Sequence, residues 1–349
     1  MGFTKALMDW HAETVRDFPW HGERDPYRIW VSEVMLQQTR AETVIRYYGR
    51  FLEQFPTVHS LADAPLERVL KCWEGMGYYS RAKNLHCAAQ IVSREMDGQL
   101  PESTEALLKL PGVGKYTAAA LASVVFGRRE LAVDGNVQRA LARILGIEEN
   151  VTTPTAKKAL LEGGQALMSA DHPGDFNQAI MGLGSMVCTP KNPDCARCPV
   201  SAYCEARKAG LQAALPVLPP KIEKRIERRA VALVFANDRV LVRRRPNDGL
   251  LGGLWEFPNF VEINSAAALT EALGELGAGG ILLTRLPPTK HIFTHLVWEM
   301  WGYQYENGAL GEERNDLRFV DLAEMGTLTI PVAMKLYLGL AQDRLGGRK

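Results

Sequence analysis

Four cysteines near the middle of the chain are the residues whose type and spacing specify chemistry most clearly. They are Cys188, Cys195, Cys198 and Cys204, spaced C-x6-C-x2-C-x5-C. Thiolates so close repel one another unless a soft cation binds them, so the spacing indicates a metal centre. The uneven gaps differ from zinc patterns, which usually pair two C-x2-C knuckles. A cubane iron–sulfur cluster suits such a loop better, and four unrelated buried cysteines are the alternative.

A carboxyl group on an apolar helix face is the second feature with chemical potential. Glu33 lies in the helical pattern of 27–39 and shares its face with Ile29, Trp30 and other apolar or amide side chains. Desolvation on such a face raises the pKa of a carboxyl group, which then holds its proton near neutral pH. The alternative is a surface glutamate that bonds a neighbouring lysine.

A second carboxyl group, Asp134, precedes an amphipathic helix in the stretch Val133-Asp134-Gly135-Asn136-Val137. The sequence favours two roles equally, because aspartate before a flexible Gly-Asn is also good N-cap chemistry. One protonated and one ionised carboxyl group are what cleavage of a glycosidic bond requires. The acid protonates the leaving group, and the carboxylate stabilises the cationic sugar carbon.

A glycine-rich turn joins two helical segments at 110–118. Gly112 and Gly114 allow backbone conformations with positive φ, and they leave amide hydrogens uncovered at the start of the second helix, next to Lys115. Such amides with the helix dipole behind them bind phosphate. This is the sequence form of a helix-hairpin-helix, which grips the DNA backbone without reading bases. An ordinary interhelix turn is the alternative.

The secondary-structure elements that must position these residues fall into two regions with different sequence patterns. Up to about Gly210, apolar residues recur at spacings of three and four. The predicted helices there are 26–37, 66–73, 81–96, 103–110, 116–126 and 137–145. Beyond Arg229, we expect strands at 230–236, 240–244 and 299–305 and a helix at 266–276. The predicted domains are therefore 1–210 and 230–349, joined by a proline-rich linker at 211–229 whose basic part, Lys221–Arg229, is expected to be solvated.

Bulk composition narrows the class of protein. A chain of 349 residues exceeds the usual size of one domain, and 46% hydrophobic with 23% charged residues is ordinary for a globular protein. The net charge of +1 does not by itself announce a nucleic-acid partner. We expect no signal peptide and no membrane-spanning segment, because no apolar run approaches about 20 residues. Cys72 and Cys87, outside the cysteine loop, are expected to be core residues in a reducing compartment.

Taken in order, these features resemble a known superfamily. Glu33, the glycine-rich hairpin, Asp134 and the cysteine loop are similar to the helix-hairpin-helix–Gly-Pro-Asp DNA glycosylases that carry a 4Fe–4S cluster. Within that superfamily the chain resembles the MutY-type adenine DNA glycosylases over nearly its whole length. The resemblance implies a multidomain fold, with an all-α glycosylase domain that includes the iron–sulfur loop and a C-terminal α+β domain.

The resemblance also implies the roles of the catalytic residues. Glu33 is the acid that protonates the adenine ring, Asp134 is the carboxylate that stabilises or bonds the sugar cation, and Tyr116 and Asn136 support the same site. In the similar endonuclease III enzymes a lysine stands at the place of Tyr116 and forms an imine with the sugar. Since tyrosine cannot form an imine, we expect a monofunctional glycosylase.

Further residues match positions that contact DNA. Gln38 and Tyr78 match side chains that wedge into the duplex, which offsets part of the free energy of extruding a base. The C-terminal domain resembles the Nudix fold, but the best alignment of the metal-binding box, from Glu256, has Thr270 in place of its arginine and lacks one of its paired acids. We therefore do not expect nucleotide hydrolysis. In MutY-type proteins a Phe-Ser-His loop reads 8-oxoguanine, and this chain has Phe293-Thr294-His295.

The sequence therefore predicts a DNA repair enzyme with a 4Fe–4S cofactor. Its expected partner is double-stranded DNA with adenine opposite 8-oxoguanine or guanine, and its product is an abasic site in an unbroken strand. We expect a monomer in the bacterial cytoplasm, associated with the nucleoid. The main alternative is a bifunctional endonuclease III-like glycosylase and lyase. A catalytically silent DNA-binding module and a nucleotide hydrolase are the others, and the two carboxyl groups and the altered Nudix box argue against them.

Overall fold

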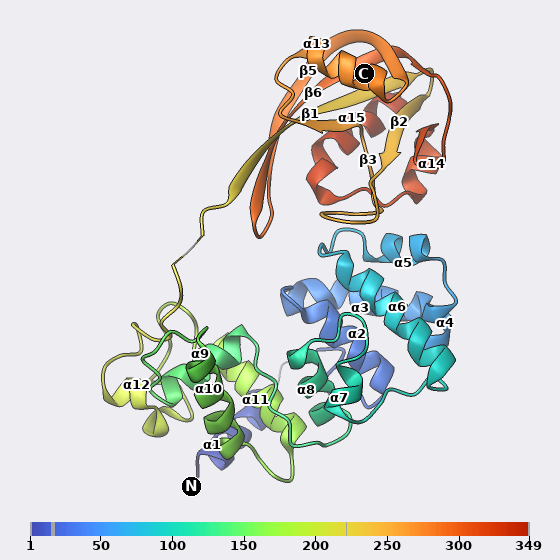
Figure 1. The fold of residues 1–349 in the computed structure, drawn as a ribbon. Coiled ribbons are helices and arrows are strands. Elements are labelled where there is room, and N and C mark those ends of the chain that lie inside the picture. The colour runs from blue at the N-terminus through green and yellow to red at the C-terminus, as the bar shows by residue number, and fades with distance from the viewer. Residues whose placement is uncertain (1, 15–17, 221, 348–349) are drawn as a thin grey trace. The chain divides into compact units, whose positions relative to one another are not determined.

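The structure is a computed structural model that describes residues 2–14, 18–220 and 222–347 (Figure 1). Lys221, the first residue of the expected solvated segment, lies outside the described residues. The chain divides into two compact units. The first unit contains Met1–Ala64 and Asn84–Lys221, and the second contains Pro65–Lys83 and Ile222–Lys349. The predicted domain limits of 1–210 and 230–349 stay a prediction.

The first unit is helical. Its helices are α1 (Phe3–Thr14), α2 (Pro26–Leu36), α3 (Ala41–Gln54), α4 (Val58–Ala62), α6 (Ser80–Glu95, from Asn84 onward), α7 (Thr104–Leu107), α8 (Lys115–Val124), α9 (Gly135–Ile144), α10 (Pro154–Leu167), α11 (Pro173–Met186) and α12 (Glu205–Lys208), with a 3₁₀ turn at Ser201–Tyr203. Short polar residues begin several of them, as where Asp25 accepts from the backbone N–H of Tyr27 ahead of Pro26. Apolar faces of α1, α9, α10 and α11 form one core.

The helices expected from apolar spacing are present, with shifted ends. The largest difference is at 103–110, where the helix covers only Thr104–Leu107. Ser103 caps it, and the residues up to Leu110 close as turns ahead of Pro111. Proline disfavours a helical conformation in the residue before it. The apolar periodicity at 103–110 therefore predicted a longer helix than the backbone can form. Among the described residues, no helix is long and apolar enough to cross a membrane.

The second unit is an α+β structure. It contains α5 (Leu66–Trp73), α13 (Ala266–Glu275), α14 (Leu322–Thr327), α15 (Lys335–Leu345), a 3₁₀ turn at Val332–Met334, and the strands β1 (Arg225–Ala236), β2 (Arg239–Arg244), β3 (Trp255–Glu256), β4 (Asn259–Val261), β5 (Ala278–Ile292), β6 (Leu296–Leu310) and β7 (Leu317–Val320). The strand order is β3-β2-β1-β6-β5, with β4 paired to β1 and β7 to β2. β1 and β6 are parallel and place Glu227 opposite Trp298. β1 and β2, which contain the strands expected at 230–236 and 240–244, pair antiparallel as a hairpin with Asn237-Asp238 at its turn.

The basic segment before the sheet differs from the sequence-based expectation. From Arg225 onward it is not a solvated tether but the start of β1. Glu227 and Arg229 are buried there, whereas Ile226 is exposed. Alternate residues of a strand point to opposite faces. Glu227 and Arg229 therefore point to the same inward face of the sheet as Val231, which belongs to the core. Charge composition alone indicated solvent, because it did not show that these charges are paired.

Candidate active site

Glu33 lies near the end of α2, a helix whose neighbouring side chains Trp30, Val34 and Met35 are buried. Its own side chain is partly buried. Burial is the main reason why the pKa of Glu33 is raised to about 7; the hydrogen bond from Tyr116 opposes this rise, and the negative charge of Asp134 adds a smaller one. The raised pKa expected from the apolar helix face is thus confirmed. Near neutral pH, this carboxyl group exists in both protonated and ionised forms.

Tyr116 reaches Glu33 from α8, the second helix of the glycine-rich hairpin. Its hydroxyl donates to Oε2 of Glu33 at 3.1 Å and lies 3.2 Å from Sδ of Met181. Burial, together with the nearby carboxylates of Glu33 and Asp134, raises the pKa of Tyr116 well above its ordinary value. The phenol therefore stays protonated and acts as a donor. A second polar contact joins the same helices, since Nε2 of Gln37 donates to the Thr117 hydroxyl at 3.0 Å.

Asp134 is the N-cap of α9, and both of its carboxylate oxygens accept hydrogen bonds. The backbone N–H of Val137 donates to Oδ1 at 2.7 Å, and Nδ2 of Asn136 donates to Oδ2 at 3.0 Å. These donors fix the orientation of the carboxylate. The structure thus brings Glu33, Tyr116, Asp134 and Asn136 into one electrostatically coupled site, and Asp134 is a cap as well as a member of it.

Arg139 supports this site and was not identified from the sequence. Its Nη2 donates to Oδ1 of Asn136 at 2.9 Å and to the Gly184 carbonyl at 2.6 Å, and its Nε donates to the Cys188 carbonyl at 2.8 Å. One guanidinium therefore connects the amide that holds Asp134 to the start of the cysteine loop. The available signal was its position three residues after Asn136 on a helix, where the two side chains are neighbours.

The glycine-rich hairpin leaves backbone amides open at the start of α8. Gly114 is the N-cap and provides no side-chain cap, and Lys115 beside it is exposed. Gly112 has a positive φ, of 76°, whereas Gly114 has a φ of −88°, so only the first of these two glycines adopts the left-handed conformation that glycine allows. A Cβ atom at Gly112 would lie 2.6 Å from Cβ of Asn84. Gly112 is thus required by both its φ and the close approach of α6.

The four loop cysteines line a single cavity, together with Arg143 and the apolar side chains of Val187 and Val200. Burial is the main reason why the pKa of Cys198 is raised to about 11, with a smaller contribution from the charges of the other three cysteines against a lowering hydrogen bond from the Val200 backbone. Among the described residues, no group of three or more His, Cys, Asp or Glu side chains is arranged to hold a metal ion. A 4Fe–4S cluster has another requirement, since each thiolate binds its own iron at a corner of a cube. Four sulfurs around one cavity fit that requirement.

Arg143 is a second residue that the sequence did not single out. It is only 2% exposed, and its guanidinium faces the cysteine loop. Nη1 donates to Sγ of Cys188 at 3.3 Å and to the Thr189 carbonyl at 2.8 Å, while Nε donates to the Leu215 carbonyl at 2.8 Å. A buried cation at this place offsets the negative charge of thiolates and fixes the loop backbone.

The two residues expected to wedge into DNA share an unusual backbone conformation. Gln38 follows α2 in the first unit with a φ of 55°, and Tyr78 lies in the second unit with a φ of 48°. Positive φ is uncommon for residues other than glycine and is characteristic of functional turns. Tyr78 is 45% exposed, and the guanidinium carbon of Arg81 lies 5.4 Å from the centroid of its ring.

The Phe293-Thr294-His295 turn joins β5 to β6 in the second unit. The backbone N–H of Phe293 donates to the Leu296 carbonyl at 2.9 Å, and Thr294 and His295 are exposed. The Thr294 hydroxyl lies 2.7 Å from the hydroxyl of Tyr78, so they share a hydrogen bond. The structure therefore brings together two residues that the sequence placed in separate domains.

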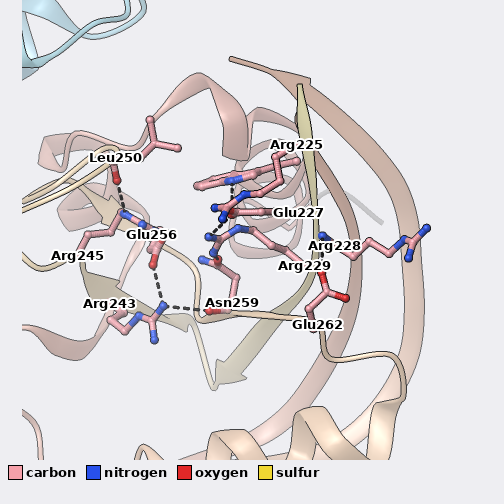
Figure 2. Close-up of polar contacts among 11 residues, drawn as sticks. Arg225, Glu227, Arg228, Arg229, Arg243, Arg245, Leu250, Glu256, Asn259 and Glu262 are labelled. Atoms are coloured by element: carbon pink, nitrogen blue, oxygen red, sulfur yellow. Dashed lines mark hydrogen bonds and ion pairs between the residues drawn. The ribbon is translucent and has the colours of Figure 1, made fainter. Parts of the chain in front are cut away.

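Glu256, the first residue of the altered Nudix box, is fully buried on β3 (Figure 2). Its carboxylate accepts from Nη2 of Arg243 at 2.8 Å and from Nη1 of Arg245 at 2.6 Å. The side chain is thus engaged in two ion pairs. Thr270, at the place of the box arginine, bonds the Ala266 carbonyl at 3.0 Å.

Comparisons with known proteins agree with this arrangement. Residues 31–166 match the HhH-GPD superfamily of base excision DNA repair proteins, 188–204 match the iron–sulfur binding domain of endonuclease III, and 230–340 match the NUDIX domain. The solved structure of a thermostable thymine-DNA glycosylase superimposes with a TM-score of 0.55 at 31% identity, over 59% of this chain and 95% of that chain. An endonuclease III–DNA complex, at 21% identity and a TM-score of 0.51, shares the fold. The fold and site thus define a helix-hairpin-helix DNA glycosylase with a C-terminal Nudix-like domain.

Relatives that match nearly the whole chain identify the glycosylase family more narrowly. The adenine DNA glycosylase of Mus musculus is 34% identical over 99% of this chain and 79% of its own length. That of Homo sapiens is 33% identical over 99% of this chain and 75% of its own length. The chain belongs to the adenine DNA glycosylase family. It is a DNA repair enzyme with DNA as its partner, and its cofactor is a 4Fe–4S cluster.

Proposed function

We propose that this enzyme removes adenine mispaired with 8-oxoguanine, and with guanine, by hydrolysis of the N-glycosidic bond. The observation that carries the proposal is the pair of unlike carboxyl groups, Glu33 with a pKa of about 7 and Asp134 held by donors to both oxygens. The relatives' names support adenine as the base. Tyr116, at the place of the lysine that forms an imine in similar lyases, supports a monofunctional reaction.

The reaction assigns one role to each group. Glu33 donates its proton to a ring nitrogen of adenine, and the glycosidic bond breaks with its electron pair leaving on the base. Asp134 stabilises the positive charge that develops on the sugar carbon, and Asn136 holds Asp134 in place. Water then adds to that carbon and returns a proton to Glu33. Tyr116 orients the Glu33 carboxyl group throughout.

DNA binding distributes over both units. We propose that the open amides at Gly112 and Gly114, with Lys115, bind a phosphate of the duplex. The exposed side chains of Gln38 and Tyr78 enter the base stack and offset part of the free energy of extruding adenine. We further propose that the turn at 293–295 contacts 8-oxoguanine, with the exposed Thr294 hydroxyl as the hydrogen-bonding group and Phe293 and His295 beside it.

We also propose that Cys188, Cys195, Cys198 and Cys204 are the four ligands of the cluster. When bound, the cluster cross-links the loop at four points of the chain. Arg143 and Arg139 fasten the same loop to α9, the helix that Asp134 caps. In this proposal the role of the cysteine loop is structural: it keeps its own shape and that of the neighbouring segments.

Replacing Arg143 with methionine is expected to weaken the loop. The change leaves the buried Leu215 carbonyl and the partly buried Thr189 carbonyl without the Arg143 donor, at about 1–3 kcal/mol for a buried unsatisfied group. We expect faster loss of iron on incubation with a chelator and a lower melting temperature. Arg207→Met is the matched control, because Arg207 lines the same cavity but is exposed. Wild-type iron retention in Arg143→Met would contradict the role assigned to this guanidinium.

One assay tests the proposed reaction. Duplexes with adenine opposite 8-oxoguanine, guanine or thymine, and one with an oxidised pyrimidine, are incubated with the enzyme and divided into samples with and without alkali. We expect strand scission only after alkali, fastest opposite 8-oxoguanine, slower opposite guanine and absent from the other two. Scission without alkali would show lyase activity, and activity on the oxidised pyrimidine alone would favour the endonuclease III-like alternative.

A further inference from the structure

A buried group of charges, which includes Glu227 and Arg229, lies in the second unit (Figure 2) and contacts Trp298, whose ring packs against Phe293. Glu227 and Arg229 project from β1 on the inward face that Val231 continues, and each residue is only 9% exposed. Burying charges is unfavourable unless they are paired and hydrogen-bonded. These charges are paired, and the same groups also hold an aromatic side chain.

Glu227 fixes the indole of Trp298 at its N–H. Oε2 of Glu227 accepts from Nε1 of Trp298 at 3.0 Å and from Nη2 of Arg229 at 2.8 Å, while Oε1 pairs with Arg225. Burial alone would raise the pKa of Glu227. Hydrogen bonds and charges from Arg229 and Arg225 outweigh this effect and hold the pKa below its usual value. The carboxylate is therefore ionised, and a hydrogen bond to a charged group is worth about 1.5–3 kcal/mol.

Arg229 fixes the face of the same indole. Its guanidinium carbon lies 4.1 Å from the centroid of the Trp298 ring, well within the range of a cation–π contact. Nη1 of Arg229 donates to Oδ1 of Asn259 at 2.8 Å, which prevents the guanidinium from turning. Trp298 is fully buried, and its ring is held by the bond at its edge, by the Arg229 guanidinium and, at 5.6 Å from the ring centroid, by the guanidinium carbon of Arg245.

Trp298 in turn supports the turn that carries Thr294. The ring of Phe293 packs edge-on against Trp298 with a centroid separation of 4.9 Å and an interplanar angle of 69°. Nζ of Lys224, just before β1, donates to the Phe293 carbonyl at 2.6 Å. Thr294 follows directly and is exposed, so the placement of its hydroxyl depends on how firmly Phe293 is anchored.

A buried ion pair is weak evidence for stability, because apolar residues of similar volume often serve equally well. Here the ion pair fixes the orientation of the Trp298 indole, because an indole in a purely apolar pocket has no directional contact. We propose that Glu227, Arg229 and Trp298 are positioning residues for the Phe293–His295 turn and thereby set the preference for 8-oxoguanine over guanine opposite adenine. This inference rests on the lesion-reading role proposed above for that turn.

The test uses two variants of the full-length enzyme that remove the anchor in different ways. Glu227→Met/Arg229→Met removes both members of the pair, so that no lone charge is left buried. Trp298→Phe keeps the charges and an aromatic ring but removes the N–H. Single-turnover rates of adenine release are measured opposite 8-oxoguanine and opposite guanine. We expect the ratio of the two rates to fall roughly three- to tenfold, the effect of one hydrogen bond, with the guanine rate changed less than about twofold.

Glu299→Gln is the matched control. Glu299 follows Trp298 on β6, points to the other face of the sheet and pairs with Lys290 at 3.3 Å. Amide hydrogen exchange over 290–298 gives a readout independent of activity, because the Phe293 amide is bonded to the Leu296 carbonyl. We expect faster exchange in both test variants and wild-type exchange in the control.

The outcomes separate the two proposals. Equal wild-type rates opposite 8-oxoguanine and guanine would overturn the lesion-reading role and, with it, the assigned control of preference. If the wild type prefers 8-oxoguanine and Thr294→Val loses that preference, the lesion-reading role stands. Unchanged preference and unchanged amide exchange in both anchor variants would then overturn the positioning role alone.

Discussion

Replacing Glu33 with glutamine is expected to reduce the rate of adenine release by roughly 10²–10⁴-fold, the usual contribution of a general acid. Glutamine keeps the size of the side chain and can still accept from the Tyr116 hydroxyl, which donates to Oε2 of Glu33 at 3.1 Å. It cannot give a proton to adenine. Single-turnover rates with a duplex containing adenine opposite 8-oxoguanine measure the effect.

The same residue sets the expected pH dependence. The active form of Glu33 is protonated, and its pKa is about 7. The wild-type single-turnover rate should therefore be highest below that pH and fall about tenfold per pH unit well above it. Glu53→Gln, an exposed glutamate on α3, is the control and should keep both the rate and the profile. A rate that is flat or rises through pH 7 would contradict the assignment of Glu33 as the acid.

The raised pKa also predicts how the variant changes stability. A carboxyl group with a higher pKa in the folded protein binds more protons there than in the unfolded chain at intermediate pH. Its contribution is full below the ordinary value of 4.5 and is lost as pH rises through about 7. Glu33→Gln should therefore gain stability relative to wild type at pH 8 but not at pH 4.5, measured by denaturant unfolding. The exposed Glu53→Gln should show no such pH-dependent gain.

The sequence was informative where chemistry requires rare residue types at fixed spacing. Four cysteines in one loop, a carboxyl group on an apolar helix face and two glycines beside Lys115 each allow few interpretations. Apolar periodicity likewise located the helices, because burial of one face imposes it. The ends of helices were less certain, as at 103–110, since capping by Ser103 and the turn before Pro111 depend on local backbone geometry.

What the sequence did not show depends on partners distant along the chain. Glu227 and Arg229 belong to a buried network only because β6, some 70 residues later, places Trp298 opposite them. Arg139 and Arg143 look like ordinary solvent-facing helix residues until carbonyls of the cysteine loop are placed beside them. The positive φ of Tyr78 and its bond to Thr294 also arise from tertiary packing. The sequence shows where a charged residue occurs, but not which residue pairs with it.

Replacing Asp134 with asparagine is expected to lower adenine release about 10³-fold, because a neutral amide cannot stabilise the developing sugar cation. Asparagine is itself a good N-cap, so α9 should still form. Its amide would nevertheless face Nδ2 of Asn136, whose Oδ1 already accepts from Arg139, so we expect a stability loss of about 1–2 kcal/mol.

Asp321→Asn makes the same change at the N-cap of α14, where the side chain accepts from the Glu324 backbone N–H at 2.8 Å. This control should keep wild-type activity. Duplex affinity measured with a non-cleavable substrate separates binding from chemistry, and we expect Asp134→Asn to change it less than about threefold, because the hairpin and wedge residues remain intact. An Asp134→Asn enzyme that folds, binds the duplex and releases adenine at the wild-type rate would remove the second carboxylate from the mechanism and leave catalysis to Glu33 alone.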